Sequence, residues 1–400
     1  MSEFTCSTPP GEIGHRIAKF QHYLRSEGID GALILQNTDL YYFSGTIQQS
    51  HLYIPAQGQP LLMVRKSLKR ARAESPLEAI VALSSPGQLM ELIGDHGLKT
   101  PATLGMELDV MPVNTYFAYR KRFPEVEVHD VSTPIRLLRA VKSDYELDLI
   151  RQAAAFSDQV AACMPGLLQE GLTEIELAGQ VEAQARRLGH QGIVRMRLWG
   201  AEMFYGHLMA GSAAALPSYL ASPTGGGAVN AAVAQGPSFR PIRPNEPILL
   251  DYVFAWQGYI SDHTRIFCIG RPPQQLVDAH AHMLELQARI KAMATPGTLA
   301  GDLYAAAIEM AAQMGLGDHF MGAGGSDRIR FIGHGVGLEL DEFPFLAHGQ
   351  TTALEAGMVI ALEPKLIYPG KGVVGIENTH VVTPQGLEQL TVAEEQIVCV

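Results

Sequence analysis

Four carboxylates and one histidine stand beside short apolar segments after residue 250, and they constrain the fold more than any other feature: Asp251, Asp262, His334, Glu363 and Glu377. The first two acids occur in ILLDYVFAWQGYISDHTRIF, which predicts a β-hairpin because a Gln-Gly turn signal separates two apolar runs. A turn centred on Trp256 and Gln257 would place Asp251 directly opposite Asp262. Two like charges in that position destabilise a sheet unless one is protonated or a cation lies between them.

The second acid pair repeats this arrangement in GMVIALEPKLIYPGKGVVGIENTHVVT. One apolar strand ends at Glu363, the Pro-Gly-Lys-Gly cluster turns the chain, and a β-branched strand leads to Glu377. The midpoint of the two glutamates is Gly370, inside the turn, so we expect them to face each other. Two such hairpins predict one cluster of four carboxylates, and charge balance then calls for roughly two divalent ions.

The histidine comes from FIGHGVGLELDEFPF, where Gly333, Gly335 and Gly337 surround His334 with backbone that can approach a ligand closely. Any one of the five residues alone is more often an ordinary core or loop residue. Together they predict a metal site, and four carboxylates with one imidazole favour Mn, Co, Fe or Zn. The sequence does not choose among these metals.

These motifs resemble those of the pita-bread metalloenzymes: methionine aminopeptidase, prolidase, Xaa-Pro aminopeptidase and creatinase. The resemblance extends over nearly the whole chain, and SDHTR, GHGVGLE, LEP and IENT match around the five ligand positions. It implies a dinuclear centre, with Asp251 on one ion, Asp262 and Glu377 bridging both, and His334 and Glu363 completing the other. A metal-bridging water would be the nucleophile, in keeping with the chemistry of paired ions.

The resemblance also implies two domains. Residues 1–138 would form a creatinase-type, ribonuclease-H-like α/β domain, and residues 139–400 an α+β pita-bread catalytic domain. The residues themselves agree: a helical pattern over 13–27 and strand patterns at 31–35, 79–83 and 102–106 alternate in the first part. A capping box at Ser143 starts a helix near the expected boundary. The family's N-terminal domain makes dimer contacts, so a homodimer is expected.

The chain departs from the peptidase pattern around the substrate. Asp341 stands where those peptidases usually carry a second histidine, and Gln235 stands where another histidine is usual. Gly375 replaces an arginine found in many prolidases, and Lys365 replaces the glycine after the Glu-Pro pair. The metal ligands are therefore retained while the substrate contacts differ, which leaves the reaction less constrained than the metal site.

Four residues are candidates for substrate contact or catalysis. His207, in YGHLMAGS, is the first candidate for a catalytic or substrate-binding role, with Tyr205 beside it. Asp341 is a second catalytic candidate, and with Glu342 it would add negative charge at the pocket rim and suit a substrate with a free amine. Lys365 would pair with Asp341 or Glu342, bind a substrate carboxylate, or point to solvent. A loop histidine and an exposed acidic turn are the ordinary alternatives.

Composition excludes several classes of protein. The formal net charge of −11 and the absence of a Lys/Arg run argue against nucleic-acid binding. The cysteines Cys6, Cys163, Cys268 and Cys399 have no CxxC spacing, so buried thiols in a reducing cytoplasm are expected. No apolar stretch has the length of a membrane span, and the first residues lack a signal-peptide pattern.

The sequence therefore predicts a dinuclear metal-dependent hydrolase that acts on a small peptide or small-molecule substrate, with a Xaa-Pro dipeptidase or aminopeptidase as the favoured activity. A different pita-bread reaction is the alternative, either C–N hydrolysis of a small amine compound or a sulfoniopropionate-type lyase. A binding scaffold without catalysis is disfavoured, because it would have no reason to keep a destabilising buried acid cluster.

Overall fold

A computed structural model describes residues 8–200, 202, 205–324 and 328–400. Its contacts divide the chain into two compact units, Met1–Arg139 and Ala140–Val400. Cys6 lies outside the described residues, so its expected burial is not addressed. No described helix is both long and apolar enough to cross a membrane.

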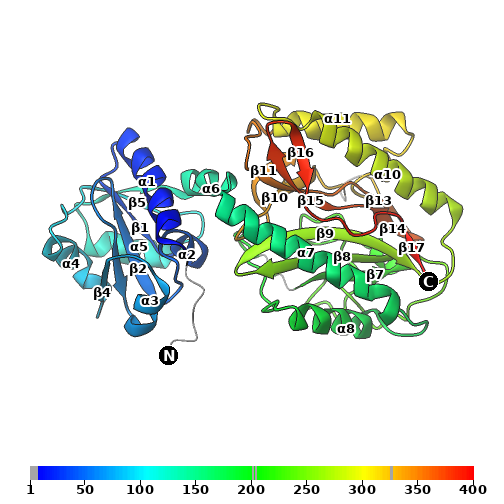
Figure 1. Cartoon of the computed structure of the whole chain (residues 1–400), viewed down its shortest axis with the longest axis horizontal. Helices are drawn as coiled ribbons and strands as arrows, with labels where there is room; N and C mark the ends of the chain where they lie inside the picture. The colour runs from blue at the N-terminus through cyan, green and yellow to red at the C-terminus, as the bar shows by residue number, and fades with distance from the viewer. Residues whose placement is uncertain (1–7, 201, 203–204, 325–327) are drawn as a thin grey trace. The chain divides into compact units, whose positions relative to one another are not determined.

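The N-terminal unit has a mixed β-sheet with strand order β4-β3-β2-β1-β5-β6 (Figure 1). Strand β1 pairs antiparallel with β2 and parallel with β5, which makes the sheet mixed. The strands are β1 Gly31–Ile34, β2 Ser50–Pro55, β3 Leu61–Val64, β4 Ala79–Ala82, β5 Thr103–Met106 and β6 Glu127–Asp130. The helices are α1 Pro10–Ser26, α2 Asn37–Ser44, α3 Leu68–Glu74, η1 Pro86–Gln88, α4 Leu89–Asp95, α5 Val113–Arg122 and α6 Ser132–Ala140. The predicted α/β architecture is confirmed.

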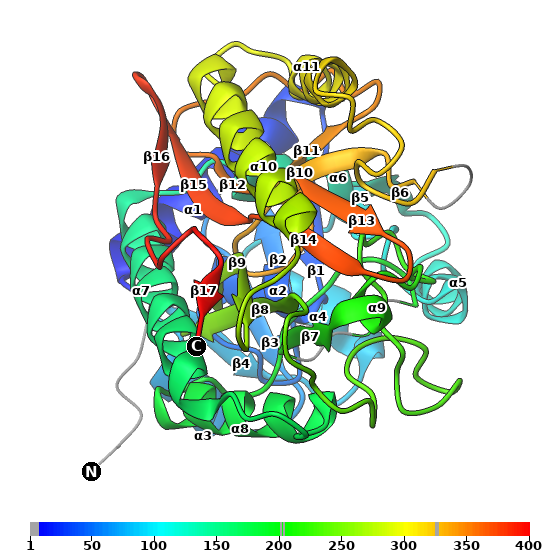
Figure 2. The same cartoon turned by 90° about the vertical axis from the view of Figure 1, so that its right-hand side faces the viewer.

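The C-terminal unit has two helix pairs that cover different sheets (Figures 1 and 2). The first pair is α7 Asp144–Leu167 and α8 Glu174–Arg187, and it packs on β7, β8 and β9. Capping boxes at Ser143 and Thr173 start these helices, as their sequences predict. The second pair is α10 Gln274–Met293 and α11 Ala300–Gln313, and it packs on the later strands; a short helix, α9 Gly211–Ala214, follows β7.

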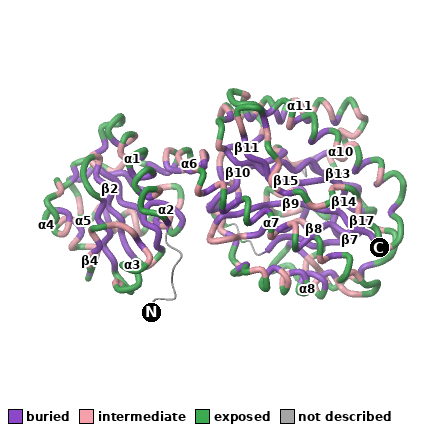
Figure 3. Tube along the Cα trace, in the orientation of Figure 1, coloured by how far each residue is buried: buried purple, intermediate pink, exposed green. Residues whose placement is uncertain are grey.

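The strands of this unit form a four-stranded sheet, β17-β9-β8-β7, a five-stranded sheet, β11-β10-β12-β15-β16, and the two-stranded ribbon β13-β14. Their bounds are β7 Gly206–Ala210, β8 Ile248–Trp256, β9 Tyr259–Cys268, β10 Phe331–Gly335, β11 Glu342–Ala347, β12 Val359–Leu362, β13 Lys365–Tyr368, β14 Gly372–Gly375, β15 Asn378–Thr383, β16 Gly386–Gln389 and β17 Val398–Cys399. These strands are largely buried, whereas the helices expose one side (Figure 3).

The two larger sheets meet through β9 and the start of β15. The backbone N–H of Thr264 donates to the carbonyl of Glu377. The Thr379 hydroxyl accepts from the backbone N–H of Asp262 and donates to the carbonyl of the same residue. These contacts fix the acids of one sheet against those of the other. The site described next is therefore held by strands and is not carried on loops alone.

Candidate metal centre

The hairpin β8–β9 carries Asp251 and Asp262, but its register differs from the prediction. Trp256 pairs with Tyr259, so the two turn residues are Gln257 and Gly258. The predicted turn consisted of Trp256 and Gln257, so the observed turn lies one residue later in the chain. Both turn residues have positive φ, 49° and 89°, which is the requirement of the two-residue type I′ turn.

The shifted register places Asp251 opposite Thr264 and Asp262 opposite Val253. The predicted direct opposition of the two aspartates is therefore wrong. They are diagonal neighbours on one face of the sheet, which is still close enough for both to reach one site.

Glu363 and Glu377 lie where the ladder between β12 and β15 passes into the ribbon β13–β14. Leu362 pairs with Asn378 on one side, and Lys365 pairs with Gly375 on the other. These flanking registers place the two glutamates across from each other. Both are buried, and the Thr264 hydroxyl donates to Oε2 of Glu377 at 2.7 Å.

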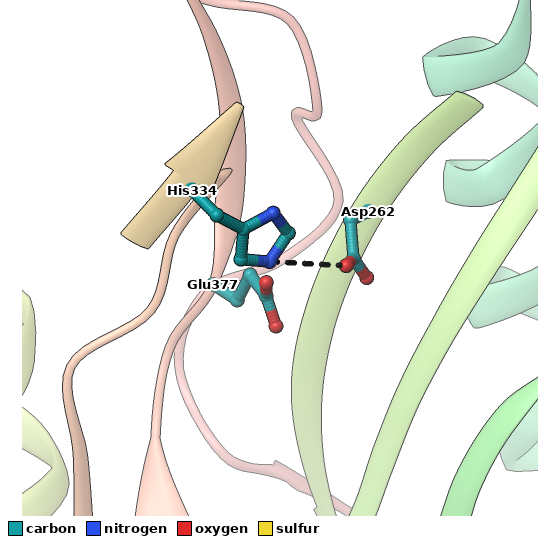
Figure 4. Close-up of side chains that lie close together, drawn as sticks. All are labelled: Asp262, His334 and Glu377. Carbon is teal, nitrogen blue, oxygen red and sulfur yellow. Dashed lines mark ion pairs between the residues drawn. The ribbon is translucent and has the colours of Figure 1, made fainter. Parts of the chain in front are cut away.

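His334 lies on β10 next to β12, and its ring enters the acid cluster (Figure 4). Its Nε2 is 3.8 Å from Oδ2 of Asp262 and 3.7 Å from Oε1 of Glu363. Ligand atoms of Asp262, His334 and Glu377 all lie within 4.8 Å of one another, and the three residues are buried. These three residues are thus close enough together to share one metal ion.

Asp341 contacts the other side of the same ring. Its Oδ1 is 3.5 Å from Nδ1 of His334, and the Gly335 carbonyl lies 3.1 Å from the same nitrogen. Two oxygens at Nδ1 favour the tautomer with the proton there, which leaves Nε2 as the acceptor that faces the acids. Asp341 lies at the pocket, as expected for a candidate residue, but its contact is with the histidine.

Lys365 is fully buried inside the acid cluster, with 0% of the side chain exposed. Its Nζ lies 2.7 Å from Oε2 of Glu363, 3.0 Å from Oε2 of Glu377 and 3.1 Å from Oδ2 of Asp251. The sequence left open a pairing with Asp341 or Glu342; the observed partners are instead these three ligand-position acids, and exposure to solvent is excluded. A signal for this existed: Lys365 follows Glu363 by two residues, the spacing that puts side chains on one face of a strand.

The crowding of charge is visible in the pKa values. Burial, together with Glu377 and Asp251, raises the pKa of Asp262 well above its usual range. Burial raises the pKa of Glu377 to about 7, although Lys365 opposes the rise. Burial lowers the pKa of Lys365, but Asp251, Glu363 and Glu377 outweigh it and raise that pKa well above the ordinary value. The cluster therefore favours bound cations or protons.

The acids and His334 line a pocket with a largely apolar wall. All five predicted ligands line it, together with His207, Gln235 and Asp341. The apolar lining residues are Met196, Leu198, Trp199, Leu220, Ala221, Pro223, Phe331 and Leu340, and Ser222 completes the lining. No lysine or arginine of the described chain is among these lining residues.

His207 faces this pocket from β7, where it pairs with Asp251 of β8. Its Nδ1 lies 3.1 Å from the Thr224 hydroxyl, and Gln235 lines the same pocket. Burial lowers the pKa of His207, against the opposing effect of Asp251. Thr224 is thus a polar partner of His207 that the sequence alone did not assign.

Tyr205, predicted to bind substrate, and Glu342, predicted at the pocket rim, lie elsewhere. Tyr205 is 4% exposed and packs in the core against His190, with ring centroids 4.4 Å apart, so it is not in the pocket lining. Glu342 is buried, and its Oε2 accepts from Nζ of Lys142 at 2.9 Å. Glu342 therefore adds no charge at the pocket rim, because its side chain turns inward and forms an ion pair with Lys142.

With this geometry in view, comparison with known proteins is decisive. The sequence model of metallopeptidase family M24 matches residues 148–384. The chain belongs to metallopeptidase family M24. The creatinase/prolidase N-terminal domain matches residues 16–141, so the expected combination of a creatinase-type domain with a pita-bread M24 domain is confirmed.

Relatives span the full length of this M24 protein. It is 28% identical over 386 residues to a Xaa-Pro dipeptidase of Pyrococcus furiosus, covering 96% of this chain and 99% of the relative. The solved prolidase from Pyrococcus furiosus is 27% identical, with a TM-score of 0.76 and coverage of 94% and 99%. A Xaa-Pro dipeptidase from Bacillus anthracis, at 24% identity and a TM-score of 0.82, shares the fold over 97% and 100% of the two chains.

Family membership implies a divalent metal, and the residues around His334 fit such an ion. Asp262 has a buried oxygen, Oδ1, without a hydrogen-bond partner in the described structure, beside the Nε2 face of His334. Such an oxygen beside an imidazole acceptor is a suitable donor set for a divalent ion. On the Asp251 side of the cluster, an ammonium already contacts three carboxylates.

Proposed function

We propose that the protein is a divalent-metal-dependent hydrolase that cleaves the bond before proline in short peptides. The observation that carries the proposal is the buried group of Asp262, His334 and Glu377 at the base of a pocket in an M24 fold. Full-length similarity to a protein named Xaa-Pro dipeptidase supports the substrate class.

Each residue has a distinct part in this proposal. Asp262, His334 and Glu377 would hold the ion, with Glu363 beside them, and Asp341 would keep His334 in the binding tautomer. When bound, the ion would polarise a carbonyl and lower the pKa of water. His207 and Gln235, which line the same pocket, would hydrogen-bond the substrate amide that is being cleaved.

The pocket favours a substrate with an apolar ring and a cationic end. Its apolar residues suit a proline ring, and Asp341 suits a free amine. Because no lysine or arginine is in the described lining, a free carboxylate would lack a cationic partner there. This favours tripeptides and longer Xaa-Pro peptides over dipeptides.

The same lining supports a second candidate function, C–N hydrolysis of a small cationic amine compound. Such a substrate needs no carboxylate partner, and family positions that carry histidine in peptidases are Asp341 and Gln235 here. A lyase of the sulfoniopropionate type has no separate support.

A substrate screen tests the proposal. Purified protein supplied separately with Mn, Co, Fe or Zn is incubated with Xaa-Pro dipeptides, Xaa-Pro-Xaa tripeptides, and betaine, sulfonium and cyclic-amidine compounds. We expect metal-dependent release of the first residue from tripeptides, abolished in Asp262→Asn. Turnover of a small amine compound with no peptide cleavage would replace the proposal with the second candidate. A cytoplasmic location, a homodimer and a metal drawn from Mn, Co, Fe and Zn stay predictions from the sequence.

A further inference from the structure

The ammonium of Lys365 occupies one side of the acid cluster. It lies within 3.1 Å of oxygens from Asp251, Glu363 and Glu377. These oxygens come from β8, from the segment after β12 and from the segment before β15, so the lysine joins three parts of the unit. Ammonium-to-carboxylate contacts of this length are those of charge-assisted hydrogen bonds.

The backbone directs this side chain inward. Lys365 pairs with Gly375 across the ribbon, and its carbonyl accepts from the N–H of Met321. A Cβ at Gly375 would lie 3.0 Å from Cγ of Lys365 and 2.4 Å from the carbonyl oxygen of Pro364. The missing side chain at Gly375 therefore gives the lysine its passage into the cluster.

The carboxylates divide their oxygens between two cation positions. Glu363 presents Oε2 to Lys365 and Oε1 to the Nε2 side of His334. Asp262 turns its Oδ2 towards His334, at 3.8 Å from Nε2. Lys365 thus lies on the Asp251 side of the cluster, while Oδ2 of Asp262 and Oε1 of Glu363 remain directed at His334.

We propose that the Lys365 ammonium takes the place of a second divalent ion, so that the protein holds one ion, bound by Asp262, His334 and Glu377. Metal–oxygen bonds of about 2.0–2.2 Å need the oxygens that Lys365 already contacts, and the two cations would repel. The charge is nearly balanced: four carboxylates carry −4, and one divalent ion with one ammonium carries +3. The proposal differs from the two ions that the sequence predicts. It rests on the metal dependence in the proposed function, not on the substrate.

Metal content of the full-length protein tests the inference. Protein equilibrated with excess Mn²⁺ and freed of loose ion on a desalting column is measured by elemental mass spectrometry, with folding checked by tryptophan fluorescence. We expect about one ion in the wild type and about two in Lys365→Gly, because the glycine reopens the second position. Lys371→Gly, in the exposed turn of the same ribbon, is the matched control and should stay at about one ion.

Asp251→Asn keeps the test decisive if Lys365→Gly does not fold. In the proposed arrangement Asp251 binds the lysine, so the variant should retain the ion, whereas Asp262→Asn should lose it. Two ions in the wild type, or loss of the ion from Asp251→Asn, would overturn the inference and leave the proposed function standing. One bound ion without peptide cleavage would count against the proposed function only, and a wild type without any ion would overturn both.

Discussion

The replacement Lys365→Met tests the buried ion cluster in the metal-free protein. Methionine keeps an unbranched chain of similar length but removes the charge, which leaves Asp251, Glu363 and Glu377 without their shared cation. Removing one partner of a buried ion pair costs about 3–5 kcal/mol. Because one ammonium serves three carboxylates and is fully buried, we expect a loss near the upper end of that range at pH 7.5.

The loss should shrink on acidification. Lys365 opposes the rise that burial causes in the pKa of Glu377, so without the ammonium this pKa rises further above that of the unfolded chain. A carboxylate with a raised folded pKa binds its proton more readily in the folded state, so the variant gains stability as the pH falls from the folded pKa towards the unfolded one. The gain is about 1.4 kcal/mol per pH unit for each carboxylate that titrates in this way.

Urea unfolding followed by tryptophan fluorescence measures this effect. Both tryptophans, Trp199 and Trp256, belong to the C-terminal unit, so their emission reports the unfolding of that unit. Protein treated with chelator is compared at pH 7.5 and pH 5.5, with the exposed Lys371→Met as the control, expected within about 0.5 kcal/mol of the wild type. A loss below about 1 kcal/mol at pH 7.5, or an equal loss at both pH values, would refute the reasoning.

Three further predictions concern separate parts of the molecule. Glu342→Gln should destabilise the C-terminal unit by about 3–5 kcal/mol in the fluorescence assay, because it leaves the buried Lys142 ammonium without its carboxylate; an effect below about 1 kcal/mol would contradict this. Burial, with help from Arg65, lowers the pKa of His51 to about 4, so stability should fall by about 2 kcal/mol between pH 6.5 and pH 5 as the unfolded chain takes up the proton. His51→Phe should lose that share of the acid sensitivity in urea titrations followed by circular dichroism, and an unchanged pH dependence would exclude the explanation. Excess divalent metal should raise the unfolding free energy by about 2.7 kcal/mol at a hundred times its dissociation constant, and Asp262→Asn should show no such rise.

The helices and most strands follow from local patterns that the sequence displays. The capping boxes at Ser143 and Thr173 both form, because their side chains satisfy backbone donors within one turn and need no distant partner. The ribbon around Gly370 also has the register expected from its turn residues. Local signals were sufficient where the interaction itself is local.

The register of β8–β9 shows where local reasoning fell short. The Gln-Gly pair predicts a turn, but centring that turn between Trp256 and Gln257 gives the wrong strand pairing. A type I′ turn needs positive φ at both of its residues, and Gln257 and Gly258 are the two that have it. Placing Gln257 and Gly258 at the two turn positions would have given the observed pairing of Asp251 with Thr264. That error changed which residues face each other but not which face they share.

The chemistry of the cluster depended on contacts between distant strands. The sequence identified the acids and His334, but whether Lys365 would turn inward depended on Gly375 across the ribbon and on the meeting of two sheets. Tyr205 is predicted beside the substrate but packs against His190. The residues next to Tyr205 in the sequence carry no signal that its ring is part of the core. Residue identity predicts which side chains gather in the cluster, and tertiary packing brings Lys365 in among them.

A crystal of the protein grown with Mn²⁺ and measured for anomalous scattering tests the central claim most directly. We expect one anomalous peak, bounded by Asp262, His334 and Glu377, with the Lys365 ammonium still in contact with Asp251. A second peak between Asp251 and Glu377, with the lysine displaced, would contradict the claim, as would the absence of any peak in the acid cluster.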